Sequence, residues 1–196
     1  VRRIPGAEVV GACDRELLMA EQLAERRRIP CSSSDLGRLL DEARPDVVHV
    51  TTPPQGHLDI AARCLDRGCH VYVEKPFTVD ASEAATLLGL AAERGLKLTV
   101  GHNLQYTWEM MEARELVRAG YLGGPPVHIE SYYTYGLGDP SYARALLGDK
   151  DHWVRRLPGG LLHNIISHGI ARVAEFLDDD LTDIIARGHQ SEQLRR

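Results

Sequence analysis

The chain has 196 residues, of which 43% are hydrophobic and 26% charged, and its formal net charge is −5. This composition is typical of a globular protein, and the negative net charge argues against a nucleic-acid-binding protein. The sequence contains neither a signal peptide nor an apolar run near the roughly 18 residues that span a bilayer, so we expect a cytoplasmic protein without membrane or nucleic-acid partners. Its four cysteines form no Cys-x-x-Cys pair and predict reduced thiols, with no disulfide and no metal site.

Strand and helix patterns alternate through the first part of the chain. Strands are expected at residues 7–13, 46–51, 69–73 and 96–100, and helices at 15–28, after the capping cluster at 32–35, at 57–67 and at 81–94. This alternation predicts an α/β protein with a Rossmann-type, doubly wound parallel sheet. Right-handed crossovers then bring the carboxyl ends of all the strands to one edge.

The pattern changes after Asn103. A helix is expected at 108–119, a strand of a different sheet at 127–135, a helix at 160–177 and the beginning of another strand at 181–186. We therefore expect part of an α+β domain with a mainly antiparallel sheet, and we place the boundary between the two domains near residue 104.

Polar side chains follow the expected strands, where an α/β sheet binds its ligands. Asp14 follows the first of them, at the position from which an acid holds the ribose of a dinucleotide, and the adjacent Arg15 leaves a 2′-phosphate possible. The alternative for Asp14 is an ordinary acid at a strand end. The other residues singled out at this edge are Thr51 and Thr52 with Pro53 of the same turn, His57, Glu74, Lys75, His102 and Asn103.

The glycine-rich turn of a dinucleotide-binding fold lies about 20 residues before such an acid, which places it upstream of Val1. We therefore expect the first strand and its glycine turn to be absent, and residues 1–6 to be the end of the first helix. On this hypothesis the chain is an internal fragment.

Glu74, Lys75 and Pro76 place a cation and a carboxylate together at a strand end. An exposed ion pair would explain them, but the run resembles the Glu-Lys-Pro signature of the Gfo/Idh/MocA family of nicotinamide-dependent oxidoreductases. The resemblance implies that Lys75 contacts both cofactor and substrate. It also implies a cofactor cleft lined by Asp14, Arg15, Thr51, Thr52, Pro53, His57, Glu74, Lys75 and Asn103.

A second motif begins at Gly159-Gly160, and in it Asn164 and His168 lie four residues apart on one helix face. A histidine on an apolar helix is commonly a core residue. The segment nevertheless resembles the family's Gly-Gly…Asp-x-Gly-x-His helix, with Asn164 in place of the usual acid and Ile166 in place of the usual glycine. Because an asparagine cannot act as a base, proton transfer would be left to His168 with Lys75.

The resemblance implies an NAD(P)-dependent oxidoreductase that transfers a hydride between the cofactor and a secondary alcohol of a sugar or cyclitol. Residues 1–104 would be the N-terminally truncated dinucleotide-binding domain, and residues 105–196 the C-terminally truncated substrate and oligomerisation domain. Lys75 and His168 would be catalytic, and Gln105, Tyr106 and Asn164 would bind substrate with them. We expect the full-length protein to be a homo-oligomer and the fragment itself to be inactive. An NAD-dependent glycosidase and a non-catalytic, ligand-binding regulatory relative remain as alternatives.

Overall fold

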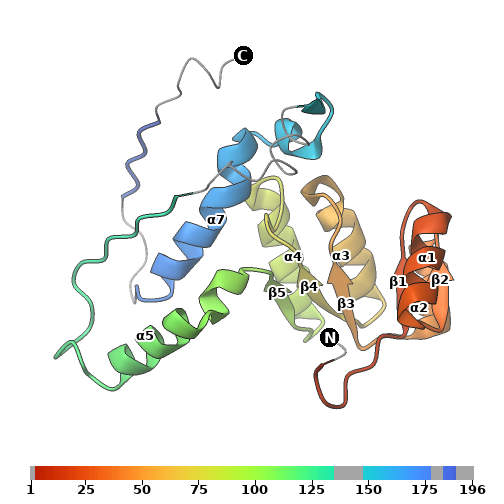
Figure 1. The fold of residues 1–196 in the computed structure, drawn as a ribbon, viewed down its shortest axis with the longest axis horizontal. Helices are drawn as coiled ribbons and strands as arrows, with labels where there is room; N and C mark the ends of the chain where they lie inside the picture. Colours follow the sequence, from red (N-terminus) through yellow and green to blue (C-terminus); the bar gives the residue numbers. More distant parts are fainter. Residues whose placement is uncertain (1–2, 135–147, 178–182, 189–196) are drawn as a thin grey trace.

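The structure, a computed structural model, describes residues 3–134, 148–177 and 183–188. Its N-terminal part is a parallel α/β arrangement, as the alternating pattern predicts (Figure 1). Strand β1 (Gly11–Cys13) pairs in parallel with β2 (Cys31–Ser33). Two helices, α1 (Leu17–Arg27) and α2 (Leu36–Ala43), follow these strands in turn.

A second parallel sheet has the strand order β3-β4-β5. It consists of β3 (Val47–Val50), β4 (His70–Val73) and β5 (Leu98–Val100). The connections are a short 3₁₀ helix η1 (Pro54–Gly56) with α3 (His57–Asp66), and then α4 (Ala81–Glu93). The register aligns Val50 with Val73 and Val73 with Val100, so all three strands end at the same level.

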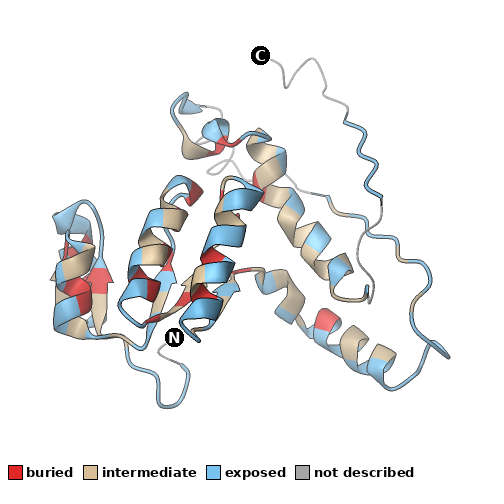
Figure 2. Cartoon of the chain, turned by 180° about the vertical axis from the view of Figure 1, so that it is seen from behind, coloured by how far each residue is buried: buried red, intermediate tan, exposed pale blue. Residues whose placement is uncertain are grey.

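The core lies where α3 and α4 cover one face of this sheet (Figure 2). Side chains alternate between the faces of a strand, so Val50 and Val73 point into this core and are 2% and 0% exposed. The opposite face carries Val47, which is 48% exposed, and the stacked rings of His49 and Tyr72.

Capping residues explain where these helices begin and end. Asp35 caps α2 by accepting a hydrogen bond from the Arg38 amide, and Asp80 caps α4 by accepting from the amides of Ser82 and Glu83. Gly95, after α4, adopts φ +64, a left-handed conformation that favours glycine.

The parallel fold is confirmed, and its strands form two separate sheets, which agrees with the expectation that the first strand is absent. In the described residues β1 and β3 are edge strands of separate sheets, and in a doubly wound sheet the first strand lies between these two positions. Strand β2 was not predicted, because its short polar sequence resembles a helix cap and its ladder is made entirely with β1. Residues 3–6 form a turn and not the expected end of a helix; the residues before them lie outside the described part.

In the described residues of the C-terminal part, the regular elements are helices, and they are joined by turns and irregular chain. This part contains η2 (Asn103–Tyr106), α5 (Trp108–Arg118), η3 (Trp153–Arg156) and α7 (Gly160–Ala174). None of the described helices is long and apolar enough to cross a membrane.

The prediction of a strand at 127–135 is wrong for the residues that the structure describes. Residues 127–134 form no strand, and residue 135 lies outside the described residues. An alternating pattern makes a strand only when a partner strand completes its backbone hydrogen bonds, and the described residues offer none. Residues 183–186 likewise form no strand, while 181 and 182 are not described.

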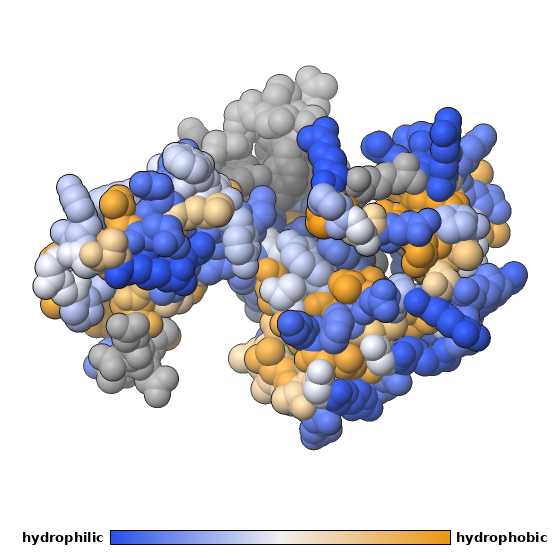
Figure 3. Space-filling view, turned by 90° about the horizontal axis from the view of Figure 1, so that it is seen from below, coloured by the Kyte–Doolittle hydropathy of each residue, from blue (hydrophilic) through white to orange (hydrophobic). Residues whose placement is uncertain are grey.

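Several large apolar side chains remain at the surface (Figure 3). They include Trp108 and Met111 of α5, which are 75% and 48% exposed, and Leu162, Ile166 and Ile170 of α7, which are 58%, 43% and 55% exposed.

Candidate active site

The candidate site begins at the carboxyl end of β4, the middle strand of its sheet. The amide of Glu74 extends the ladder by donating to the Val50 carbonyl at 2.8 Å. The Glu74 carboxylate then turns back and accepts a hydrogen bond from the Lys75 amide at 3.1 Å. The loop continues through a cis peptide bond between Lys75 and Pro76. The sheet thus presents a half-buried lysine at the edge where the polar residues were expected to gather.

The lysine reaches across to α7. Nζ of Lys75 donates to the side-chain oxygen of Asn164 at 3.0 Å and to its main-chain carbonyl at 3.1 Å. Asn164 itself is 2% exposed. The two motifs that the sequence analysis singled out therefore meet directly in the folded chain.

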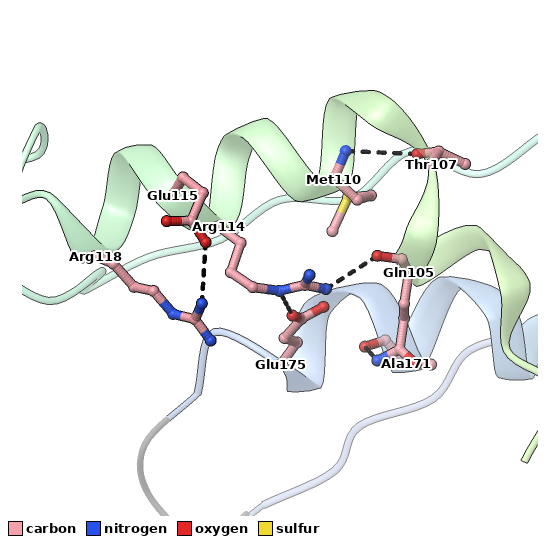
Figure 4. Close-up of polar contacts among 8 residues, drawn as sticks. All are labelled: Gln105, Thr107, Met110, Arg114, Glu115, Arg118, Ala171 and Glu175. Atoms are coloured by element: carbon pink, nitrogen blue, oxygen red, sulfur yellow. Dashed lines mark hydrogen bonds and ion pairs between the residues drawn. The ribbon is translucent and has the colours of Figure 1, made fainter. Parts of the chain in front are cut away.

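Several contacts hold α7 in this position. Gly160, its first residue, adopts φ +51, which favours glycine there. The Gln105 side chain donates to the Ala171 carbonyl at 3.0 Å, and the main-chain carbonyl of Gln105 accepts from the Arg114 side chain at 3.0 Å (Figure 4). Arg114 also forms an ion pair with Glu175 in which both side chains are 19% exposed. Gln105 thus joins η2, α5 and α7.

Burial lowers the pKa of Lys75, and the neighbouring Glu74 carboxylate partly opposes that shift. A desolvated ammonium with a lowered pKa loses its proton more readily than an exposed lysine. The lysine can therefore stabilise negative charge on a nearby oxygen and can also take part in proton exchange.

His168 lies one helical turn beyond Asn164. Its ring makes an edge-to-face contact with His102, with ring centroids 6.1 Å apart and an interplanar angle of 77°. Nδ1 of His168 is buried and has no hydrogen-bond partner in the described residues. Burial lowers the pKa of His168, and the positive charges of Lys75 and His102 lower it further, against the Glu74 carboxylate. This histidine therefore favours its neutral, proton-accepting form.

His102 is the residue that the sequence analysis placed at the sheet edge but assigned no role. Two features of the sequence could have indicated a functional role for His102: it directly follows a predicted strand, and it is adjacent to Gly101. The backbone of Gly101 lies close to the side chains of Tyr72 and Glu74. A Cβ on Gly101 would lie 3.0 Å from the Tyr72 hydroxyl and 3.1 Å from a Glu74 oxygen. The close approach of β4 and β5 at this point brings His102 to the candidate site.

On the expected cofactor side, Asp14 and Arg15 are both exposed at the end of β1. One carboxylate oxygen of Asp14 accepts a hydrogen bond from the Glu16 amide at 2.9 Å. One function of the Asp14 carboxylate is therefore structural, because it binds a main-chain amide just before α1. The exposed carboxylate at a parallel strand end nevertheless fits the ribose of a dinucleotide.

Thr51, Thr52 and Pro53 are exposed after β3, where backbone and hydroxyl groups can meet a ligand. Their loop is also tied to the C-terminal part, because the Gln55 side chain donates to the Trp153 carbonyl at 3.1 Å.

His57, by contrast, is 0% exposed. Its Nε2 lies 2.7 Å from the Thr52 carbonyl, and its Nδ1 lies 3.1 and 3.0 Å from the carbonyls of Pro76 and Phe77. The imidazole therefore links the loop after β3 to the Glu-Lys-Pro loop. The structure gives it a positional role, with its ring closed off from solvent.

The remaining predicted residues lie around the site with different exposures. Asn103 is exposed and Tyr106 is 67% exposed, so both are free to meet a ligand, whereas the Gln105 amide is engaged with α7. Among the described residues, no group of three or more His, Cys, Asp or Glu side chains is arranged to hold a metal ion. The arrangement of Lys75, Asn164, His168 and His102 can hydrogen-bond an oxygen-bearing ligand and exchange a proton with it.

Residues 1–102 match a family model described as "Oxidoreductase family, NAD-binding Rossmann fold". An uncharacterized oxidoreductase of Schizosaccharomyces pombe is 33% identical over 166 residues, which are 82% of this chain and 42% of that protein. The dTDP-3,4-didehydro-2,6-dideoxy-alpha-D-glucose 3-reductase of Saccharopolyspora spinosa is 31% identical over 189 residues, 95% of this chain and 53% of that protein. The chain thus spans about half the length of these curated relatives.

A solved structure, the myo-inositol 2-dehydrogenase of Lactobacillus plantarum, superposes with a TM-score of 0.68 at 17% identity, over 90% of this chain and 50% of that one. At this identity the superposition supports the fold alone.

Proposed function

Because the chain belongs to the oxidoreductase family with an NAD-binding Rossmann fold, Gfo/Idh/MocA, we propose that the protein transfers a hydride between NAD(P) and a secondary alcohol of a sugar or cyclitol. The observation that carries this proposal is the contact of Lys75 with Asn164, at 3.0 and 3.1 Å. That contact brings a cation and a neutral histidine to one place at the carboxyl end of a parallel sheet, where α/β proteins bind their ligands.

In the direction of alcohol oxidation, Lys75 donates a hydrogen bond to the oxygen of the reacting hydroxyl. Its charge stabilises the negative charge that develops there as the proton leaves. His168 accepts that proton, because burial and the charge of Lys75 favour its neutral form. Asn164 accepts hydrogen bonds from Lys75 and so orients the ammonium. The chemistry that NAD(P) supplies when bound is hydride acceptance, and the product is a carbonyl.

Asp14 would hold the adenosine ribose of the cofactor, and the neighbouring Arg15 suits a 2′-phosphate. Thr51, Thr52 and Pro53 would line the cleft between this end and the Glu-Lys-Pro loop. His57 links the loop after β3 to the Glu-Lys-Pro loop through contacts with their main-chain carbonyls. These assignments are supported by exposed polar groups at strand ends.

A sugar or cyclitol substrate is supported by two observations. The relative from Saccharopolyspora spinosa is named as a reductase of a dTDP-linked sugar. In this chain the groups around Lys75 include the imidazoles of His102 and His168 and the amide of Asn164, which can hydrogen-bond hydroxyl groups.

The test is to express the protein from the complete reading frame that contains this sequence. NADH and NADPH formation should be followed with a panel of sugars and cyclitols that carry secondary alcohols. We expect formation of one reduced cofactor with at least one member of the panel. Lys75→Met, which keeps the length of the side chain and removes its charge, should lower that rate roughly 10²–10³-fold while cofactor affinity changes little. A protein that binds NAD(P) but reduces it with no member of the panel would refute the proposal.

A further inference from the structure

A second histidine enters the candidate site from the end of β5. The His102 amide donates to the Val100 carbonyl at 2.8 Å, and the next amide, of Asn103, donates to the Gly101 carbonyl at 2.9 Å. His102 has φ −77 and ψ 63, which is the geometry of an inverse γ-turn. The backbone therefore turns sharply at this residue, and the turn fixes where its side chain begins.

The ring of His102 is placed by its edge-to-face contact with His168 of α7, at 6.1 Å between centroids. It is thus held from two sides, by the end of the sheet and by the helix that also carries Asn164. Aromatic rings in this arrangement restrict each other's orientation.

Both rings nevertheless leave a polar atom without a partner. Nε2 of His102 and Nδ1 of His168 are buried, and neither has a hydrogen bond within the described residues. Buried polar atoms in folded proteins are almost always paired with protein, water or ligand. Two such atoms on adjacent rings indicate a place where a polar ligand completes the hydrogen bonding.

The surrounding charges select the kind of ligand. Lys75 and Glu74 face His102 from the end of β4, and His168 faces it from α7. Burial and the charge of Lys75 lower the pKa of His102, with Glu74 opposing, so both histidines favour their neutral forms. A neutral imidazole donates from one nitrogen and accepts at the other, which suits hydroxyl groups, and Lys75 disfavours a bound cation.

We propose that His102 is a further substrate-binding residue, whose Nε2 binds the hydroxyl adjacent to the one that His168 and Lys75 engage. The proposal rests on the function proposed above and adds to it a requirement for two neighbouring hydroxyls. Because a site built to hydrogen-bond a hydroxyl rejects the analogue that lacks it, His102 determines specificity for a vicinal diol.

The experiment uses myo-inositol as the probe, added to the protein from the complete reading frame in the presence of NAD(P). Binding is followed through the imidazole proton resonances of His102 and His168. We expect both resonances to shift along one binding curve. His102→Phe, which keeps an aromatic ring but removes both nitrogens, should weaken myo-inositol binding about 10-fold. His102→Gln, which returns a polar group near the position of Nε2, should restore most of that loss.

His49→Phe is the matched control, because His49 is another histidine of the same sheet whose exposed ring is stacked on Tyr72, and it should leave the binding curve unchanged. The proposal is overturned if the His102 resonance does not respond to myo-inositol, or if the Phe and Gln variants bind it as wild type does. Turnover is measured separately on the same samples. Resonance shifts without turnover would support the role of His102 in binding and count against the oxidoreductase function. Failure of the His102 proposal can therefore be distinguished from failure of the proposed function.

Discussion

Lys75 and Asn164, 89 residues apart in the sequence, form the contact around which the candidate site is built: one ammonium donates to the side-chain and main-chain oxygens of one buried asparagine. Three consequences follow from the contact. It connects the end of β4 to α7, it holds the cation in place, and it gives Asn164 the role of an acceptor in place of a base.

Asn164→Asp tests that role. The new carboxylate would raise the pKa of both Lys75 and His168, because a nearby negative charge favours their protonated forms. Alcohol oxidation needs neutral His168. As the pH is lowered, the oxidation rate of the variant should therefore begin to fall at a higher pH than that of wild type, while the variant remains active. The measurement is the pH profile of kcat/KM for both proteins. Asn164→Ala, which keeps the main-chain acceptor and adds no charge, is the control. Identical profiles for Asp and wild type would place Asn164 outside the site.

His168→Asn should lower the oxidation rate by roughly 10²–10⁴-fold, the usual range for a general base. In wild type the rate should fall as pH drops through the pKa of His168, which lies below its ordinary value of 6.5. This ionisation should be missing from the pH profile of the variant. If the pH profile of the variant shows the same fall at low pH as wild type, His168 is a packing residue and not the general base.

His57→Phe should destabilise the fold by about 1–3 kcal/mol, because the buried carbonyls that the imidazole contacts would lose their partner. Denaturant unfolding of the variant, with His49→Phe as the control on an exposed ring, measures this difference. Stability equal to wild type would show that His57 does not hold the two loops together.

His102 and His168 also predict how stability depends on pH. Burial lowers the pKa of both in the folded state, so below pH 6.5 the unfolded chain binds protons that the folded chain does not. Stability should therefore decrease as pH falls from about 6.5 through the folded-state pKa values. Thermal unfolding at several pH values measures this, and the double variant His102→Phe, His168→Phe should show a weaker dependence in the same range. An unchanged dependence in the double variant would assign the effect to other groups.

The sequence predicted the parallel fold well because periodicity and helix boundaries are local signals. Asp80 and Gly95 mark the two ends of α4, and helix α5 ends within one residue of its expected limit. Strand β2 was missed and the strand at 127–135 was wrongly expected for a common reason. Whether a short segment becomes a strand depends on a partner elsewhere in the chain, which a local pattern does not reveal.

The same distinction applies to the site. Lys75, Asn164 and His168 could be predicted as candidates because their motifs are contiguous in sequence. The burial of His57 and the meeting of His102 with His168 depend on how the ends of β3, β4 and β5 approach α7. Only the folded chain shows that the imidazole of His57 faces main-chain carbonyls.

The most direct test of the account is a double-mutant cycle on Lys75→Met and His168→Asn, with kcat/KM measured for wild type, both single variants and the double variant. If both side chains act on one hydroxyl, the second substitution should cost little once the first is made, because residues that act as a unit are strongly non-additive. We predict that the double variant is within about 10-fold of the slower single variant. Losses that simply multiply, or single variants that retain wild-type turnover, would contradict the claim that the lysine loop and α7 form one active site.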